Sequence, residues 1–526
     1  MYRVRDLNVG FDRPIVKNVS FDLKPGLCLA LVGESGSGKS VTARSLMGIA
    51  GQNAKVTGSL QLDGEELSKL RGRQWAKIRG SKIGLVLQDA LVSLDPLRPI
   101  GREIGDTLRL HANIPRGDIP GRVVELLRSV GLDDPESRAL QRSEQLSGGQ
   151  RQRALIAAAI AADPPILIAD EPTTALDRTV QTHIVDLLRS LKEQGKALLL
   201  ITHDLSVVDS IADEVAVMVG GEIVEHGPTE QVLSNPRHEK TRELIASVPT
   251  RSPNPPRKPA TPVLQGMDLV RIFPGTGNIP DRTAVDHVSL DLQRGETLGL
   301  VGSSGSGKTT LARLLLGLDT PTTGMVTLLG QPWSELPETE RRERRRKISI
   351  IYQDALSSFD PRMRVGSILA DAASFGKYPT YRRAPKEIRD TVESLLSDVG
   401  LPPATVTARP LHLSGGMRQR IAIARALATD PEILVSDEPV SSLDVTVQAE
   451  ILSLLQRLQA DRGLTQFFIS HDLGVIGQVS DRIAVMSGGK IVEIGGRDQV
   501  LDHPQHTATQ TLVGSLPPSA SSHDAF

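Results

Sequence analysis

The hydrophobic pattern of the chain changes after its first 26 residues. Residues 1–26 alternate apolar and polar side chains, which is typical of short antiparallel strands, with breaks at Gly10 and at positions 24–26. Continuous apolar runs follow at 27–32, 83–87, 166–169 and 198–201, and each predicts a buried strand. Helical spacing of apolar residues lies between the runs, notably within residues 95–145. Strands that alternate with helices predict an α/β fold.

The second half of the chain repeats this pattern in the same order. Apolar runs recur at 298–301, 348–351, 433–435 and 467–469, and residues 361–412 match the helical segment 95–145. The repetition indicates a duplicated unit, with one domain over residues 1–248 and a second over 263–515. Residues 249–262 contain six prolines and predict an extended linker. Residues 516–526 predict a disordered tail.

Composition and charge exclude several classes of protein. The 526 residues include 61 basic and 62 acidic side chains, a balance that argues against bulk nucleic acid as a partner. The basic run at 341–347 is interpreted as a solvated helix end before a strand. Cys28 is the single cysteine, so the chain forms no internal disulfide and no four-cysteine cluster. No apolar run approaches the length of a membrane span.

A glycine-rich loop follows the first apolar run and fits the phosphate-binding pattern G-x-x-x-x-G-K-[ST]. The loop consists of Gly33, Glu34, Ser35, Gly36, Ser37, Gly38, Lys39 and Ser40. The second half has the same loop, with the same flanks, as Gly302, Ser303, Ser304, Gly305, Ser306, Gly307, Lys308 and Thr309. Backbone N–H groups and the start of the next helix face an anion in such a loop. The recurrence disfavours the alternative of a glycine turn that binds nothing.

Five further motifs recur in both halves. The first is a glutamine that follows a strand, at Gln88 and Gln353. The second is a Ser-Gly-Gly that opens a helix and offers a second anion site. It occurs at Ser147, Gly148 and Gly149, and again at Ser414, Gly415 and Gly416. Strands end in paired acids, one suited to a metal and one to an attacking water, at Asp170 and Glu171, and at Asp437 and Glu438. The fourth motif is a Leu-Asp dipeptide, whose aspartates are Asp177 and Asp444. The fifth is a histidine at the end of a strand, at His203 and His471.

One aromatic side chain precedes each phosphate loop. Phe11 and Phe273 lie near the ends of the first predicted strand of each half. Either ring could stack on an adenine, and the alternative is a partly buried aromatic residue at a strand end.

The ordered set of motifs resembles the ATP-binding-cassette ATPases over nearly the whole chain. The resemblance implies two tandem P-loop domains, each with a RecA-like α/β core, an antiparallel β subdomain and a helical subdomain. It implies that the two cassettes pair head to tail within one chain, with each ATP between the phosphate loop of one and the Ser-Gly-Gly of the other. By resemblance, Glu171 and Glu438 polarise the attacking water, and His203 and His471 hold the γ-phosphate. The residues that attend Mg²⁺ would be Ser40, Gln88, Asp170, Thr309, Gln353 and Asp437.

A narrower resemblance is to the ATPases of dipeptide, oligopeptide and nickel importers. It rests on residues 88–96 and 353–361, on the run 169–177, and on the ends of both halves at 235–238 and 503–506. Such a subunit hydrolyses ATP on the cytoplasmic face of the inner membrane, under two membrane-spanning permeases that receive cargo from an external solute-binding protein. The chain departs from the pattern of this group at residues 239–241 and 507–509. It departs from the pattern of the wider family at Met417, and we expect that substitution to have little effect.

Three other functions have to be weighed against this one. A ribosome-associated ATPase joins its two cassettes by a long charged helix, whereas this linker is short and rich in proline. A DNA-repair ATPase interrupts its cassettes with zinc modules or coiled coils, which this sequence lacks. A sugar-importer ATPase is closer, but its second cassette usually lacks the catalytic residues that are present here.

Overall fold

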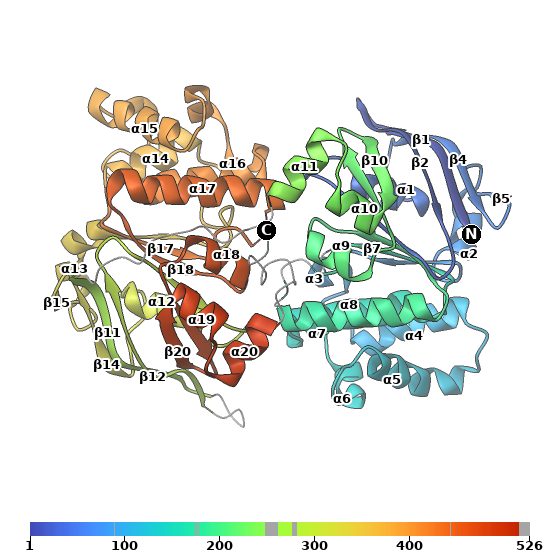
Figure 1. The fold of residues 1–526 in the computed structure, drawn as a ribbon, viewed down its shortest axis with the longest axis horizontal. Helices are drawn as coiled ribbons and strands as arrows, with labels where there is room; N and C mark the ends of the chain where they lie inside the picture. Colours follow the sequence, from blue (N-terminus) through green and yellow to red (C-terminus); the bar gives the residue numbers. More distant parts are fainter. Residues whose placement is uncertain are drawn as a thin grey trace. The chain divides into compact units, whose positions relative to one another are not determined.

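The structure is a computed structural model that describes residues 1–88, 90–173, 176, 178–247, 261–275, 281–441 and 443–514. Asp177, the disordered-tail prediction and almost all of the predicted linker lie outside these residues. The chain divides into two compact units, which take up most of its first 248 residues and most of the remainder. Figure 1 shows both units, and each is described by itself. Among the described helices, none is long and apolar enough to cross a membrane.

The first unit begins with the antiparallel sheet that the alternating pattern predicts. Its strand order is β2-β1-β4-β5. The buried residues of β1 are Tyr2, Val4, Leu7 and Val9. Alternate side chains of a strand face one side, and a register shift between Val4 and Leu7 interrupts the alternation once. The strands are β1 (Tyr2–Gly10), β2 (Pro14–Leu23), β4 (Lys55–Leu62) and β5 (Glu65–Glu66).

A six-stranded sheet forms the centre of the first unit, in the order β10-β9-β3-β8-β7-β6. All its neighbouring strands run parallel except the antiparallel pair β9 and β10. The strands are β3 (Cys28–Val32), β6 (Ile83–Val86), β7 (Ile166–Asp170), β8 (Ala197–Ile201), β9 (Glu214–Val219) and β10 (Glu222–Pro228). Every residue of β3, β7 and β8 is buried, as expected for parallel strands covered on both faces. The predicted α/β fold is therefore confirmed.

The helices of the first unit form two groups. One group shares buried cores with the strands of the sheets: α1 (Lys39–Leu46), α2 (Gly72–Ile78), α7 (Gly148–Ile160), α8 (Arg178–Glu193), α9 (Leu205–Ile211), α10 (Thr229–Ser234) and α11 (Glu239–Ala246). The other is the helical insertion, which lies beside α7 in Figure 1: α3 (Ala90–Ser93), α4 (Ile100–His111), α5 (Ile119–Ser129) and α6 (Pro135–Leu140). Its core joins Ile104 and Leu126 to Ile156 of α7.

The second unit repeats this architecture strand for strand. Its antiparallel sheet has the order β12-β11-β14-β15, and its central sheet has the order β16-β17-β18-β13-β19-β20. The strands are β11 (Pro262–Phe273), β12 (Arg282–Gln293), β13 (Thr297–Val301), β14 (Thr323–Leu328), β15 (Gln331–Pro332), β16 (Ile348–Ile351), β17 (Ile433–Asp437), β18 (Thr465–Ile469), β19 (Arg482–Ser487) and β20 (Lys490–Gly496). Pro262, which the sequence assigns to the linker, already belongs to β11.

The helices of the second unit follow a similar order, but its helical insertion has two described α-helices where that of the first unit has four. They are α12 (Lys308–Leu315), α13 (Glu338–Arg344), α14 (Val365–Ala373), α15 (Lys386–Asp398), α16 (Gly415–Leu427), α17 (Val445–Arg462), α18 (Leu473–Val479), α19 (Arg497–Asp502) and α20 (Thr507–Gly514). The basic run 341–347 precedes β16, as predicted, but it is not simply solvated. Arg341 and Arg345 lie over the Trp333 ring and donate hydrogen bonds to the carbonyl of Gly317, just beyond α12.

Candidate functional site

Each phosphate loop leaves the carboxyl end of a buried central strand and enters a helix. In the first cassette β3 ends at Val32, and α1 begins at Lys39. The backbone of Gly38, which caps α1, has a φ of 100°, in the left-handed region that favours glycine. A Cβ at Gly33 would lie 2.1 Å from the carbonyl oxygen of Met218 on β9, so no side chain fits there. The start of the loop therefore packs directly against the backbone of the neighbouring strand.

The loop lysines fold back onto their own loops. Lys39 Nζ donates to the carbonyl oxygens of Gly33 at 2.7 Å and Glu34 at 2.9 Å. Lys308 Nζ makes the same bonds, to Gly302 at 2.8 Å and Ser303 at 2.9 Å. Burial lowers the pKa of Lys39, because a desolvated ammonium loses hydration. An anion in the loop would stabilise this desolvated charge.

An acid at the end of β7 faces the hydroxyl of the phosphate-loop helix. Ser40 Oγ donates to Asp170 Oδ1 at 2.9 Å. The other oxygen, Asp170 Oδ2, is buried and has no hydrogen-bond partner among the described residues. Burial raises the pKa of Asp170, because the unsatisfied carboxylate is desolvated. A hydroxyl beside a carboxylate with a free oxygen is a donor set that suits Mg²⁺.

The second cassette has the corresponding hydroxyl–carboxylate pair, at a longer distance. Thr309 Oγ1 lies 3.4 Å from Asp437 Oδ1. Burial, and next the charge of Glu438, raise the pKa of Asp437. In both copies burial therefore disfavours the charged form of the aspartate.

The glutamate after each strand-end aspartate has an unusual backbone. Glu171 and Glu438 have φ values of 49° and 48°, in the left-handed region that non-glycine residues seldom adopt. Each backbone N–H donates to the last residue of the neighbouring strand, Ile201 at 2.9 Å and Ile469 at 3.0 Å. These bonds hold the strained conformation, which turns both carboxylates toward the same group of residues.

That group is a glutamine and a histidine in each cassette. In the first, Gln88 Nε2 donates to Glu171 Oε2 at 2.8 Å, and His203 Nδ1 lies 3.5 Å from Glu171 Oε1. In the second, Gln353 Nε2 donates to Glu438 Oε2 at 2.9 Å, and His471 Nδ1 lies 3.2 Å from the same oxygen. The structure thus brings together three residues per cassette that lie far apart in the sequence.

The carboxylates keep their histidines basic. Burial lowers the pKa of His203, but the hydrogen bond and charge of Glu171 outweigh it, and the pKa is raised overall. The pKa of His471 is raised in the same way by Glu438. Burial raises the pKa of Glu438, yet the bond and charge of His471 leave it below its ordinary value. Each pair therefore favours a carboxylate beside a protonated imidazole.

The two Ser-Gly-Gly motifs both cap helices, but with different numbers of bonds. Ser147 Oγ accepts from Gln150 N at 3.3 Å, and Gln150 Oε1 accepts in return from Ser147 N at 3.0 Å. Ser414 Oγ accepts from Met417 N at 3.3 Å, and a methionine thioether offers no comparable return bond. The Ser-x-x-Gln spacing of a capping box is the sequence signal that reveals the role of Gln150.

The second glycine of each motif is required by packing. A Cβ at Gly149 would lie 2.6 Å from Val180 of α8, and a Cβ at Gly416 would lie 2.6 Å from Val447 of α17. Gly148 has more room, since its nearest neighbour would be Leu176 at 3.7 Å. Gly415 is also beyond van der Waals overlap, at 3.4 Å from Leu443.

The remaining predicted residues lie outside these clusters. Phe11 follows β1 and is 39% exposed, and Phe273 ends β11 and is 37% exposed under the guanidinium of Arg271. Each ring is accessible, as stacking on adenine requires, and this role stays a prediction. Asp444 directly precedes α17, and its counterpart Asp177 is not among the described residues.

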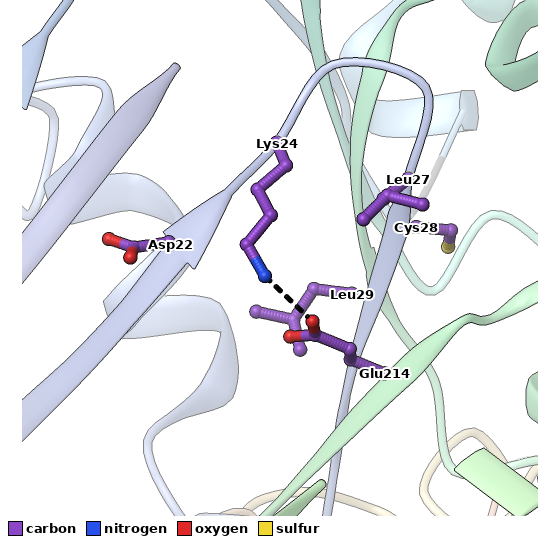
Figure 2. Close-up of a pocket in the computed structure, with 6 residues that line it drawn as sticks. All are labelled: Asp22, Lys24, Leu27, Cys28, Leu29 and Glu214. Carbon is purple, nitrogen blue, oxygen red and sulfur yellow. Dashed lines mark hydrogen bonds and ion pairs between the residues drawn. The ribbon is translucent and has the colours of Figure 1, made fainter. Parts of the chain in front are cut away.

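A small hollow elsewhere in the first unit is separate from these clusters. Figure 2 shows its lining, in which the ammonium of Lys24 points to the carboxylate of Glu214, 2.9 Å away. The hollow lies where β3 begins, at Cys28, whereas the phosphate loop lies where β3 ends. It is therefore separate from the phosphate loop.

Comparisons with known proteins agree with this geometry. The ABC transporter family model matches residues 16–174 and 285–441, and the model of the oligopeptide/dipeptide transporter C-terminal region matches residues 224–268. The peptidoglycan transport ATP-binding protein YejF of Agrobacterium fabrum is 42% identical, over 97% of this chain and 95% of its own length. The glutathione import ATP-binding protein GsiA of Shigella flexneri is 40% identical, over 98% of this chain and 89% of its own length.

A solved structure shares the two-cassette fold. It is the archaeal ribosome recycling factor aABCE1, in complex with the ribosomal stalk protein aP1, with a TM-score of 0.63 and 22% identity over 91% of this chain and 88% of that chain. At that identity the likeness concerns the fold alone. From the family model and the full-length relatives, the chain belongs to the ABC transporter family, as a two-cassette ATP-hydrolysing subunit of the peptide-importer type.

Proposed function

We propose that each cassette binds and hydrolyses one Mg–ATP, and that the chain thereby drives uptake of peptides or related small solutes. The observation that supports this most is the completeness of both sites. Each has a buried loop lysine, a hydroxyl–aspartate pair and a glutamate bound by a glutamine and a histidine. Each cassette therefore offers a cation for the phosphates, a candidate metal-binding pair and a candidate base.

The residues divide into three tasks. Ser40 with Asp170, and Thr309 with Asp437, would hold Mg²⁺, which supplies positive charge to the phosphates when bound. The lysines would leave their loop carbonyls for the phosphates. Glu171 and Glu438 would orient the attacking water and accept its proton, while His203 and His471 hold the γ-phosphate. Gln88 and Gln353 would fix the carboxylates, and their contact with Mg²⁺ stays a prediction. Catalysis would rest on positioning and electrostatics.

We also propose that the cassettes pair head to tail within the chain. Each cassette offers two separate helix N-termini for an anion, α1 and α7 in the first and α12 and α16 in the second. We expect that one γ-phosphate cannot lie at both N-termini of the same cassette, because α1 directly follows β3 whereas α7 follows the helical insertion. Ser147 would then serve the nucleotide of Lys308. Ser147→Arg should impair turnover at the Lys308 site and spare first-contact ATP binding at Lys39; the reverse pattern would refute the pairing.

The names of the relatives support the proposed class of cargo. Their names state peptidoglycan transport and glutathione import, and the C-terminal model is that of oligopeptide and dipeptide transporters. All three point to solutes that contain peptide bonds. We place the chain on the cytoplasmic face of the inner membrane, with two permeases and an external solute-binding protein as partners. The ribosome-associated alternative has only the fold likeness in its favour.

Transport in a reconstituted system tests this function. The chain is combined with its two permeases in proteoliposomes, and uptake of labelled short peptides is measured with ATP supplied on the side of the cassettes. We expect uptake that needs ATP, Mg²⁺ and the solute-binding protein, and none with Glu171→Gln/Glu438→Gln. ATP-dependent binding to ribosomes without any effect of permeases on ATP turnover would instead favour the alternative.

A further inference from the structure

The last helix of the first cassette packs behind the strand that carries the phosphate loop. Leu244 of α11 is buried in a small core with Ala30 and Val32 of β3 and Val217 of β9. Val32 is the residue directly before the loop. Because these side chains are close-packed in one core, that core sets the position of α11 relative to the loop.

The start of α11 is fixed by a second set of bonds. The Glu225 carboxylate accepts the backbone N–H groups of Arg237 at 2.8 Å and His238 at 3.0 Å. His238 caps the helix, since its Nδ1 accepts the N–H of Lys240 at 3.2 Å. The side chain of Lys240 therefore starts from a well-defined place.

Lys240 reaches the phosphate loop from there. Its Nζ lies 4.0 Å from Glu34 Oε1 and 2.5 Å from Glu243 Oε2 of its own helix. Glu34 is the second residue of the loop, and its carbonyl already accepts Lys39 Nζ. A carboxylate in a phosphate-binding loop repels the anion that the loop has to bind, and a nearby ammonium offsets that repulsion.

The second cassette provides an internal comparison. Its helix α20 has the same anchor, since the Glu493 carboxylate accepts the N–H groups of Gln505 and His506 at 3.0 Å each. The two charged positions differ together: Ser303 replaces Glu34, and Ala508 replaces Lys240. The anchor is thus kept without the charges, which shows that docking of the helix does not need the lysine. Where the loop has no acid, the helix has no lysine.

We propose that Lys240 is a positioning residue that neutralises Glu34 and so raises the affinity of the first phosphate loop for nucleotide phosphates. The second loop needs no such residue. The inference rests on the proposed nucleotide site at Lys39.

The test measures binding of Mg–ATPγS to the first site alone, in the full-length Lys308→Ala chain. Lys240→Ala should weaken binding about two- to fivefold, the range of exposed ion pairs. Lys240→Arg should restore it, and the defect of Lys240→Ala should shrink in about 1 M salt. In the Glu34→Ser background, Lys240→Ala should have no effect. As a matched control, Lys240→Ala in the Lys39→Ala chain should leave affinity at the second site unchanged.

Two outcomes would overturn the inference. One is equal affinity for Lys240→Ala and its parent. The other is an equal loss of affinity when Lys240→Ala is made in the Glu34→Ser background. That result would mean that the lysine contacts the nucleotide itself or acts through helix docking. If the Lys308→Ala parent bound no nucleotide at all, the proposed function of the first site would fail instead, and the inference with it.

Discussion

The strand-end acid pairs show how one residue's backbone sets the chemistry of the site. Successive side chains of a strand point to opposite faces, so an extended Asp-Glu pair would send its two carboxylates apart. The left-handed conformation of Glu171 and Glu438 interrupts that alternation. Asp170 then faces Ser40, while Glu171 faces Gln88 and His203. The strain costs roughly 1 kcal/mol per residue and is held by the backbone bond to the next strand.

Removing the charge of both glutamates should separate binding from hydrolysis. Glu171→Gln/Glu438→Gln keeps the shape of the side chains but leaves no base, so we expect turnover to fall by roughly 10²–10⁴ while ATP binding survives. Phosphate release and equilibrium ATP binding are measured on the same preparation. Hydrolysis at the wild-type rate would remove both glutamates from the catalytic role.

The histidine–glutamate pairs also predict a dependence of stability on pH. Because the folded-state pKa values of His203 and His471 are raised, the pairs stabilise the fold below the unfolded pKa of about 6.5, and that contribution is lost as pH rises through the folded value. The free energy of unfolding in urea should therefore decline from pH 6 upward, and less steeply in His203→Gln/His471→Gln. Parallel pH profiles for the two chains would contradict this account.

At the scale of elements, both ends of each phosphate-loop helix are bound by other parts of the fold. The N-terminus carries the loop, and arginines bind the carbonyls at the other end: Arg79 donates to Met47 and Gly48 after α1. Arg341 and Arg345 do so after α12. Positive charge at a helix C-terminus complements the dipole, whose opposite end would face the phosphates of a bound nucleotide.

Packing between the Ser-Gly-Gly helix and the next helix gives a test at the same scale. Gly149→Ala would place a Cβ 2.6 Å from Val180, so we expect a loss of about 1–3 kcal/mol in the free energy of unfolding, as for other overpacked sites. Gly148→Ala is the matched control, because its Cβ would meet Leu176 at an ordinary 3.7 Å. Equal losses in urea unfolding would show that backbone freedom, and not packing, requires the second glycine.

At the scale of the whole molecule, the sequence predicts the repeat, the α/β class and the clustering of the motif residues. It does so because buried strands, glycine loops and strand-end acids each have a local signature. Other features have none. The left-handed Glu171 depends on a hydrogen bond to another strand, and the approach of Lys240 to Glu34 depends on how the chain returns to the loop. The start of β11 at Pro262 was missed because proline favours a linker.

Nucleotide stoichiometry tests the central claim that each of the two phosphate loops binds its own ATP. Equilibrium binding of Mg–ATPγS to the full-length chain is compared among wild type, Lys39→Ala, Lys308→Ala and the double variant, because each lysine would neutralise phosphate charge only at its own site. The account predicts two nucleotides per wild-type chain, one tight nucleotide in each single variant and none in the double variant. One nucleotide per wild-type chain, or two in a single variant, would contradict it.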